Sequence, residues 1–234
     1  MAEGVTLLRE ALGAGVPIES VYAAPDAPAD LLDRAASAGI RVFRLAPGVL
    51  ERVADTTSPQ PVLAVLPMPT ARLEDLRRAS LLVVCVELRD PGNAGTLMRA
   101  ARAAGADGVV LCGESVDAFN PKTVRASAGA VFRLPVVQAG PVQEVMGELA
   151  DWGITRLAAL AAGGRDPSEV DLTGPFALVV GNEAHGLDGD ALATVEESVT
   201  IPMAADTESL NVGVATAVIC FEAARQRRRA GGSS

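Results

Sequence analysis

Three polar stretches in an otherwise apolar part of the chain contain residue types that could carry chemistry. The first is "LRDPGNAGTLMRAA", residues 88–101, in which Asn93 follows a turn and can cap the helix after it. Arg99 comes six residues after Asn93, which predicts a position near the loop end of that helix. Because ligands of open α/β sheets bind beyond the carboxyl ends of the strands, we expect Arg99 to face a crevice, with a surface ion pair as the alternative.

The second stretch, "FALVVGNEAHGL" at residues 176–187, runs from an apolar strand into Gly181, Asn182 and Glu183 and closes with Gly186. Two glycines allow a backbone to pass close to a ligand or to another chain segment. An ordinary turn after a strand would look similar, so this stretch alone is a weak signal.

The third stretch, "IPMAADTESLNV" at residues 201–212, leads into a long amphipathic helix that we expect over residues 209–228. Thr207 or Ser209 can cap this helix, and Asn211 is expected in its first turn, where helix propensity does not favour asparagine. A polar first turn that accompanies two glycine-containing loops indicates a binding site.

The elements around these stretches predict one large α/β domain. Near-continuous apolar runs are typical of buried parallel strands, and they alternate with helical segments. This alternation predicts an open, mostly parallel sheet with helices on both faces. The expected strands are 81–88, 108–113, 132–138, 155–162, 176–181 and 198–203, and the expected helices are 94–105, 121–129, 141–152, 188–194 and 209–228.

A smaller α/β domain is expected at residues 1–67, with helices at 3–15, 28–39 and 47–55, strands at 18–24, 40–46 and 61–69, and a first strand that is missing or very short. The polar, proline-marked residues 68–80 indicate a linker. The larger domain then covers residues 81–230, and residues 231–234 are expected to be a disordered tail.

Composition and missing motifs exclude several classes of function. A net charge of −9 argues against a protein that coats nucleic acid non-specifically, although a local basic face remains possible. Dinucleotide-binding, P-loop and hydrolase motifs are absent from the sequence, and a single histidine, His185, makes a Ser/His/Asp triad improbable. Basic residues gather around the first two motif loops and at the end of the chain, namely Arg89, Arg99, Arg102, Lys122, Arg125 and Arg133, then Arg225 and Arg227 to Arg229.

Cys85, Cys112 and Cys220 are far apart, without C-x-x-C spacing, so we expect reduced core thiols and no metal site. No secretion leader and no apolar run of about 20 residues is visible, which predicts a cytoplasmic protein without a membrane segment.

The stretches N-A-G-x-x-x-R, V-G-N-E-x-x-G-L and I-P-M…S-L-N-V, in this order, resemble the three motifs of the SpoU (TrmH-type) RNA ribose 2′-O-methyltransferases of the SPOUT superfamily. The resemblance covers residues 81–228, and residues 1–66 resemble the small substrate-binding domain of many members. It implies a C-terminal trefoil knot that binds S-adenosylmethionine, mainly through backbone groups. The matching cofactor-binding positions are Gly181, Asn182, Ile201, Met203 and Leu210.

The resemblance further implies a homodimer packed through the knot region and the last helix. That would give the apolar stripe of Val212, Ala215, Ile219 and Ala223 a second use as an interface, with core packing inside the monomer as the alternative. Gly213 departs from the pattern, because many members have a serine there.

The implied chemistry is displacement at the sulfonium methyl group by a ribose 2′-hydroxyl of rRNA or tRNA. Arg99 matches the family's catalytic residue, as a base or as a clamp on the RNA phosphate, because a guanidinium holds its proton up to pH ~12. We expect Asn93 and Glu183 to hold Arg99 and the loops, and Ser209 and Asn211 to lie against substrate or donor. The expected RNA contacts are Arg102, Lys122 and Arg125.

Two other functions stay open. One is a non-catalytic RNA-binding protein with a degenerate knot, and the other is a knotted methyltransferase that acts on a base nitrogen. The sequence does not separate rRNA from tRNA, or housekeeping modification from antibiotic resistance.

Overall fold

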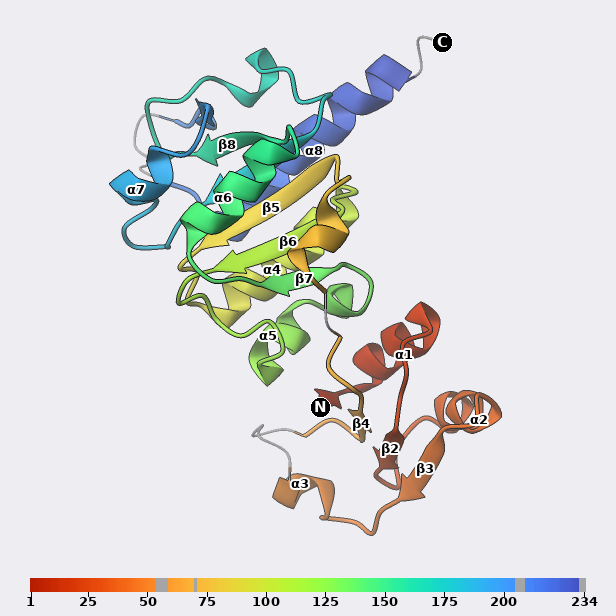
Figure 1. The fold of residues 1–234 in the computed structure, drawn as a ribbon. Helices are drawn as coiled ribbons and strands as arrows, with labels where there is room; N and C mark the ends of the chain where they lie inside the picture. The colour runs from red at the N-terminus through yellow and green to blue at the C-terminus, as the bar shows by residue number, and fades with distance from the viewer. Residues whose placement is uncertain (54–58, 70, 205–208, 232–234) are drawn as a thin grey trace. The chain divides into compact units, whose positions relative to one another are not determined.

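The structure is a computed structural model that describes residues 1–53, 59–69, 71–204 and 209–231 (Figure 1). The chain divides into two compact units, Met1–Pro69 and Thr70–Ser234. No helix in the described ranges has both the length and the apolarity needed to cross a bilayer.

The first unit is built on a four-stranded sheet in the order β1-β4-β2-β3. Strands β2 and β3 are parallel, whereas β4 runs antiparallel to both β1 and β2. Leu8 of α1 and Leu31 and Leu32 of α2 pack on the sheet against Val21 and Ala64. The elements are β1 Ala2–Glu3, α1 Val5–Ala14, β2 Ser20–Ala23, α2 Ala29–Ser37, β3 Arg41–Arg44, α3 Leu50–Val53 and β4 Val62–Val65, so the expected order is confirmed and the first strand is very short.

The second unit contains a six-stranded sheet in the order β10-β8-β9-β5-β6-β7, in which every neighbouring pair is parallel. The predicted open parallel sheet is therefore confirmed. The strands are β5 Leu81–Val86, β6 Gly108–Cys112, β7 Val136–Gln138, β8 Thr155–Ala159, β9 Phe176–Val180 and β10 Glu197–Val199. This strand order fits the trefoil knot implied by the family resemblance, and the knot itself stays a prediction.

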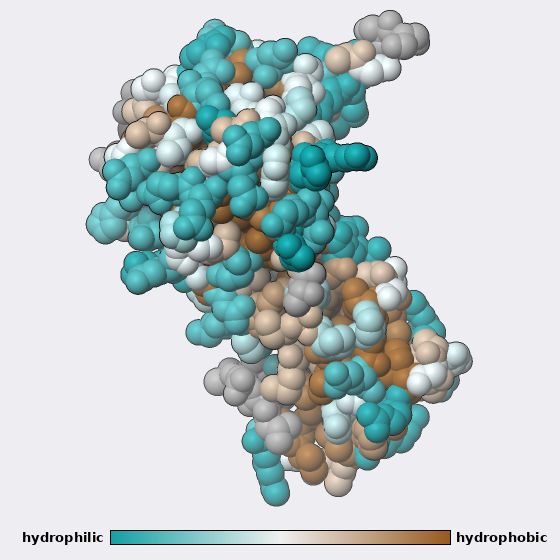
Figure 2. All heavy atoms as spheres, viewed as in Figure 1, coloured by the Kyte–Doolittle hydropathy of each residue, from teal (hydrophilic) through white to brown (hydrophobic). Residues whose placement is uncertain are grey.

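Helices cover both faces of this sheet (Figure 1). Helix α6 packs on one face, where Val145 and Met146 belong to the same hydrophobic core as the strand residues Val84 and Val110. Helices α4 and α8 pack together on the other face. Polar residues cover most of the visible surface of this unit (Figure 2). The helices are η1 Leu73–Leu76, α4 Pro91–Ala103, α5 Pro121–Ala126, η2 Ala130–Phe132, α6 Val142–Asp151, η3 Pro167–Glu169, α7 Gly189–Leu192 and α8 Val212–Gly231.

The central strands β5 and β9 are buried along their whole length, as their apolar sequences predicted. All three cysteines are free and buried, which agrees with the expected core thiols. Burial raises the pKa of the Cys112 and Cys220 thiols to about 12, because a thiolate is poorly solvated there.

Helix α4 begins earlier than predicted. Its N-cap is Asp90, whose Oδ1 accepts a 2.7 Å hydrogen bond from the Asn93 backbone N–H. Pro91 follows at the first helical position, which needs no hydrogen-bond donor. The expectation that Asn93 caps this helix is therefore wrong, and Asn93 lies in the first turn with its side chain free for other partners.

Helix α8 begins later than predicted. Asn211 is its cap, because its Oδ1 accepts hydrogen bonds from the backbone N–H groups of Gly213 at 2.9 Å and Val214 at 3.3 Å. Ser209 precedes the helix and does not cap it, and Thr207 lies outside the described residues. Asparagine is a favoured residue at an N-cap, so its low propensity for the interior of a helix does not count against it here.

Part of the segment expected to be a linker, residues 68–80, packs into the second unit. Residues Leu73–Leu76 form a short 3-10 helix, and Leu76 is 4% exposed within the core that α6 covers. Because the residues around Leu76 are polar, the sequence pattern did not indicate that Leu76 is buried.

Gly95 lets helices α4 and α5 approach backbone to backbone. A Cβ atom at Gly95 would lie 2.4 Å from the Cβ of Ala126 and 2.7 Å from the backbone nitrogen of Ser127. We expect Gly95→Ala to lower the free energy of unfolding by about 1–3 kcal/mol, as overpacking does. Gly147→Ala in α6, where nothing lies within 4 Å of the new atom, is the matched control and should raise stability by about 0.5–1 kcal/mol. Urea unfolding midpoints measure both changes, and equal effects of the two variants would contradict this account of the helix contact.

Candidate active site

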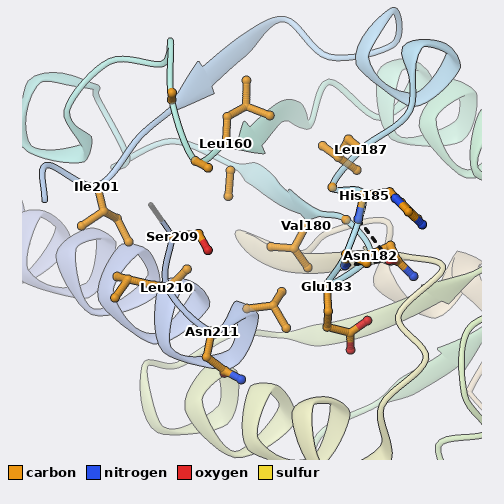
Figure 3. Close-up of a pocket in the computed structure, with 18 of the residues that line it drawn as sticks. Leu160, Val180, Asn182, Glu183, His185, Leu187, Ile201, Ser209, Leu210 and Asn211 are labelled. Carbon is orange, nitrogen blue, oxygen red and sulfur yellow. Dashed lines mark hydrogen bonds between the residues drawn. The ribbon is translucent and has the colours of Figure 1, made fainter. Parts of the chain in front are cut away.

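A cavity of about 620 Å³ opens at the carboxyl ends of β8 and β9, beside the start of α8. This is where open α/β sheets bind ligands. Figure 3 shows the segment Ser209–Asn211 on one side of the cavity and Val180–His185 on the other. The wall also contains residues 159–162, which follow β8, and Ile201 and Met203, which follow β10.

Most of the residues predicted for the site lie together around this cavity. All five expected cofactor positions line it, and so do four of the five residues expected to be catalytic. These residues are Gly181, Asn182, Ile201, Met203 and Leu210, with Asn93, Glu183, Ser209 and Asn211.

A continuous chain of hydrogen bonds joins the three motif loops. The Asn211 Nδ2 donates to Asn93 Oδ1 at 2.7 Å, and the Asn93 Nδ2 donates to Glu183 Oε1 at 3.1 Å. Asn93 thus uses its acceptor toward one loop and its donor toward the other. Because these residues are 118 and 90 positions apart in the chain, this contact fixes the relative positions of the loops.

Glu183 gathers several donors from the first motif. Its Oε1 also accepts the backbone N–H of Asp90 at 3.2 Å, and its Oε2 accepts that of Arg89 at 3.4 Å. Partial burial raises the pKa of the carboxyl, but hydrogen bonds from the Asn93 side chain and from the backbone of Glu183, Asp90 and Arg89 lower it by more. The net pKa is below the ordinary value, so Glu183 is an ionised acceptor at neutral pH.

Gly181 and Asn182 build the loop that carries Glu183. A Cβ at Gly181 would lie 2.2 Å from the carbonyl carbon of Gly186, so only glycine lets this loop close on itself. The Asn182 Nδ2 donates to the Glu87 carbonyl at 2.9 Å, and its Oδ1 accepts the N–H groups of Ala184 and His185. The Asn182 side chain is therefore engaged by the protein, and any contact with a ligand stays a prediction.

Arg99 lies elsewhere than expected. Because α4 starts at Pro91, Arg99 is the ninth residue of the helix, about 12 Å from its first residue along the axis. It is exposed, is not part of the cavity wall, and has no hydrogen bond or ion pair with the described residues. The expected position at the loop end is wrong, because the turn at Asp90 begins the helix earlier than the spacing suggested.

The basic residues expected to contact RNA lie on α4 and α5. Arg102 is one turn beyond Arg99 on α4, and both are exposed. Lys122 is exposed on α5, whereas Arg125 is half-buried. These two helices pack against each other at Gly95.

The sequence missed two parts of the site. Asp90 positions the first motif as the cap of α4, and the Asp-Pro pair before a helix was the signal for it. Residues 159–162 contribute a wall without any polar side chain, so nothing in their sequence marked them as part of a cavity.

Only part of the apolar stripe expected at an interface packs inside the monomer. Ile219 is 1% exposed and Ala223 is fully buried, which fits the alternative of core packing for these two residues. Val212 and Ala215 are half-buried and line the cavity, so an interface there stays a prediction.

Glu183 allows a direct test of the loop contacts. Its pKa is lowered by folding, so its contribution to stability is present above the ordinary pKa of a glutamate and is lost as pH falls through the lower folded value. Because the residue is exposed and water screens its charge, we expect Glu183→Gln to cost only about 0.5 kcal/mol of unfolding free energy at pH 7 and less at pH 3.

Urea titrations at both pH values measure this difference. Glu114→Gln is the matched control, because the side chain of Glu114 is 78% exposed in its ion pair with Arg89 and should contribute almost nothing. A loss at pH 7 that persists at pH 3 would refute the role of the ionised carboxylate.

Comparisons with known proteins agree with this site. The model described as the SpoU rRNA Methylase family matches residues 80–221, and that described as RNA 2′-O ribose methyltransferase substrate binding matches residues 1–71. The 23S rRNA (guanosine(2553)-2′-O)-methyltransferase RlmP of Bacillus subtilis is 34% identical over 94% of this chain and 86% of its own length.

Solved structures are similar over both units. The SpoU methyltransferase AviRb from Streptomyces viridochromogenes in complex with AdoMet has a TM-score of 0.86 at 30% identity, covering 97% of this chain and 89% of its own. The AdoMet-bound rRNA methyltransferase from Sinorhizobium meliloti has a TM-score of 0.80 at 31% identity, covering 96% and 86%. With the motifs, the fold and the cavity in agreement, this chain belongs to the SpoU family of RNA ribose 2′-O-methyltransferases.

Proposed function

We propose that this chain transfers the methyl group of S-adenosylmethionine to a ribose 2′-hydroxyl of ribosomal RNA. The observation that carries the proposal is the hydrogen-bonded chain from Asn211 through Asn93 to Glu183 at the edge of the cavity. A degenerate site would not need to keep this chain intact, which argues against a non-catalytic RNA-binding protein. The relatives named above as 2′-O-methyltransferases favour ribose over a base nitrogen, and their names favour rRNA over tRNA.

The cavity fits the methyl donor in size and chemistry. A volume of about 620 Å³ is typical of a small-molecule site, and its wall combines apolar side chains with a few polar groups. Leu160, Leu187 and Ile201 offer apolar surface to an adenine ring (Figure 3). Bound there, the donor supplies an electrophilic methyl group on a sulfonium.

The chain's own residues hold the donor and align the acceptor. Gly181, Ile201 and Leu210 present backbone groups to the donor, and Met203 and the backbone of Asn182 complete this wall. Ser209 and Asn211 line the cavity at the start of α8 and are placed to contact the ribose. A 2′-hydroxyl held there would be aligned with the donor's methyl carbon, the electrons of the carbon–sulfur bond would leave on sulfur, and the hydroxyl proton would pass to solvent.

Arg99 acts as a clamp on the RNA phosphate in this proposal. Its guanidinium is exposed and has no partner among the described residues, so it is available to an anion. A guanidinium stays protonated at physiological pH and binds a phosphate through two hydrogen bonds. To act as a base, the same arginine would first have to lose its proton. Arg102, Lys122 and Arg125 extend the contact with RNA along α4 and α5.

The proposed homodimer uses a different face of α8 from the one that the sequence suggested. Val214, Val218 and Phe221 follow helical spacing and are 46%, 43% and 46% exposed. An exposed apolar stripe of this kind is typical of an interface between subunits.

The clamp predicts a specific pattern of kinetics. We expect Arg99→Ala to lower kcat/KM for rRNA at least about 100-fold while donor binding is unchanged, and Arg99→Lys to recover part of the loss because it keeps the positive charge. Transfer of labelled methyl groups to unmodified rRNA and to unmodified tRNA, followed by nucleoside analysis, measures this and identifies the substrate class. Arg72→Ala, at an exposed ion pair with Glu74, is the control.

An Arg99→Lys variant as inactive as Arg99→Ala would contradict the clamp. Label in a methylated base would refute ribose chemistry.

The exposed stripe predicts the oligomeric state. Phe221→Asp places a charge in the proposed interface, and we expect it to convert a dimer into a monomer, which light scattering after size exclusion measures. Leu192→Asp is the control, because Leu192 is an exposed apolar residue of α7, at 36%, outside this stripe. A wild-type chain that is already monomeric would refute the interface.

A further inference from the structure

An aromatic pair stands on the sheet of the first unit. The rings of Tyr22 and Phe43 stack with their centroids 5.2 Å apart and their planes 18° apart. The two residues are direct partners in the parallel ladder between β2 and β3. The pair therefore forms a continuous aromatic surface across two neighbouring strands.

This pair projects from the face that α1 and α2 leave uncovered. Val21, Ala23 and Val42 alternate with Tyr22 and Phe43 along the same strands, and these three pack into the core beneath the two helices. Successive side chains of a strand point to opposite faces, so the aromatic pair points away from that core. Phe43 is 42% exposed and Tyr22 is half-buried beside it.

One arginine lies beside the exposed ring on the same face. Arg41 is two residues before Phe43 in β3, about 7 Å along the strand, whereas Arg44, which follows Phe43 directly, is on the opposite face with Val42. Arg41 is exposed and has no hydrogen bond or ion pair with the residues that the structure describes. In a chain with a net charge of −9, this cation is placed beside an aromatic surface.

The acidic residue in this row of the sheet is not a partner of Arg41. The row runs from Phe43 through Tyr22 and Leu63 to Glu3, which puts Glu3 three strands away. The Oε1 of Glu3 accepts the backbone N–H of Gln60 at 3.0 Å, and the residue is only 9% exposed. Arg41 is therefore the charged group beside Phe43 on this face of β3.

A cross-strand aromatic pair stabilises a sheet by itself, but that role needs neither an exposed ring nor a neighbouring cation. An exposed aromatic pair beside an unpaired guanidinium matches the two parts of a single-stranded nucleotide, since bases stack on aromatic rings and phosphates bind arginine. We infer that Tyr22 and Phe43 form a platform on which an unpaired base of the RNA substrate stacks, with Arg41 on a neighbouring phosphate. This inference rests on the proposed function, which makes RNA the substrate.

Binding of two matched probes by the full chain tests the platform. The probes are a short labelled oligouridine and an abasic ribose-phosphate oligomer of the same length, followed by fluorescence anisotropy. Phe43→Leu should weaken oligouridine binding at least about fivefold and leave abasic binding unchanged, whereas Phe43→Tyr keeps the ring and should bind normally. Arg41→Ala should weaken both probes and reduce the salt dependence. Arg9→Ala, exposed on α1 and so on the helix-covered side of the sheet, is the matched control and should change neither.

Equal oligouridine binding by the wild type and Phe43→Leu, or no binding by the wild type, would overturn the platform. So would a Phe43→Leu variant that changes only the oligomeric state, which would make this face a protein contact. Thermal unfolding of each variant checks folding, and the Phe43→Tyr variant keeps the test decisive if Phe43→Leu is destabilised.

Methyl transfer separates this inference from the proposed function. An unchanged KM for rRNA in Phe43→Leu would refute the platform and leave the enzyme activity standing. Oligouridine binding that depends on Phe43, in a chain that methylates neither rRNA nor tRNA, would refute the activity and leave the platform standing.

Discussion

The site depends on one ionised carboxylate and the groups that solvate it. Glu183 accepts hydrogen bonds from the Asn93 side chain and from the backbone N–H groups at the start of α4. Asn93 in turn accepts a hydrogen bond from Asn211 at the start of α8. Glu183 is exposed, so water solvates part of the carboxylate and these donors solvate the rest. The position of the cavity wall therefore depends on these polar contacts as well as on packing.

Close backbone approach makes this arrangement possible. Gly181 lets the second motif loop fold back on Gly186, and Gly95 lets α4 lie directly on α5. Neither position has room for a Cβ atom. The positions of the loop that carries Glu183 and of the helix that carries Asn93 therefore both require a glycine. Gly213, where many family members have a serine, is not required by such a close approach. A Cβ at this position would lie 3.0 Å from the side chain of Thr96, and a small movement of that side chain would relieve the contact.

Some arginines bind groups of the protein itself, whereas others are exposed and can bind an anion. Arg227, in the basic run at the end of the chain, donates to the carbonyls of Ser80, Leu172 and Gly174 and lies over the ring of Phe176. Burial lowers the pKa of Arg227, as desolvation of a cation must. Arg99 and Arg41, by contrast, are exposed and unpaired among the described residues. An acidic chain can therefore bind a polyanion through a few arginines that its own carboxylates do not neutralise.

The sequence by itself determined the parallel sheet, the order of its elements and the three motifs, because buried strands and capped helices leave local patterns of apolar and small residues. Tertiary structure decided the rest. Local spacing placed Arg99 at the loop end of its helix and Asn211 inside a first turn, whereas hydrogen bonds at Asp90 and Asn211 set both helix starts. The contact between Asn93, Glu183 and Asn211, and the pairing of Tyr22 with Phe43, join residues far apart in the chain. Such contacts depend on how the strands are ordered in space, and a one-dimensional pattern does not contain that order.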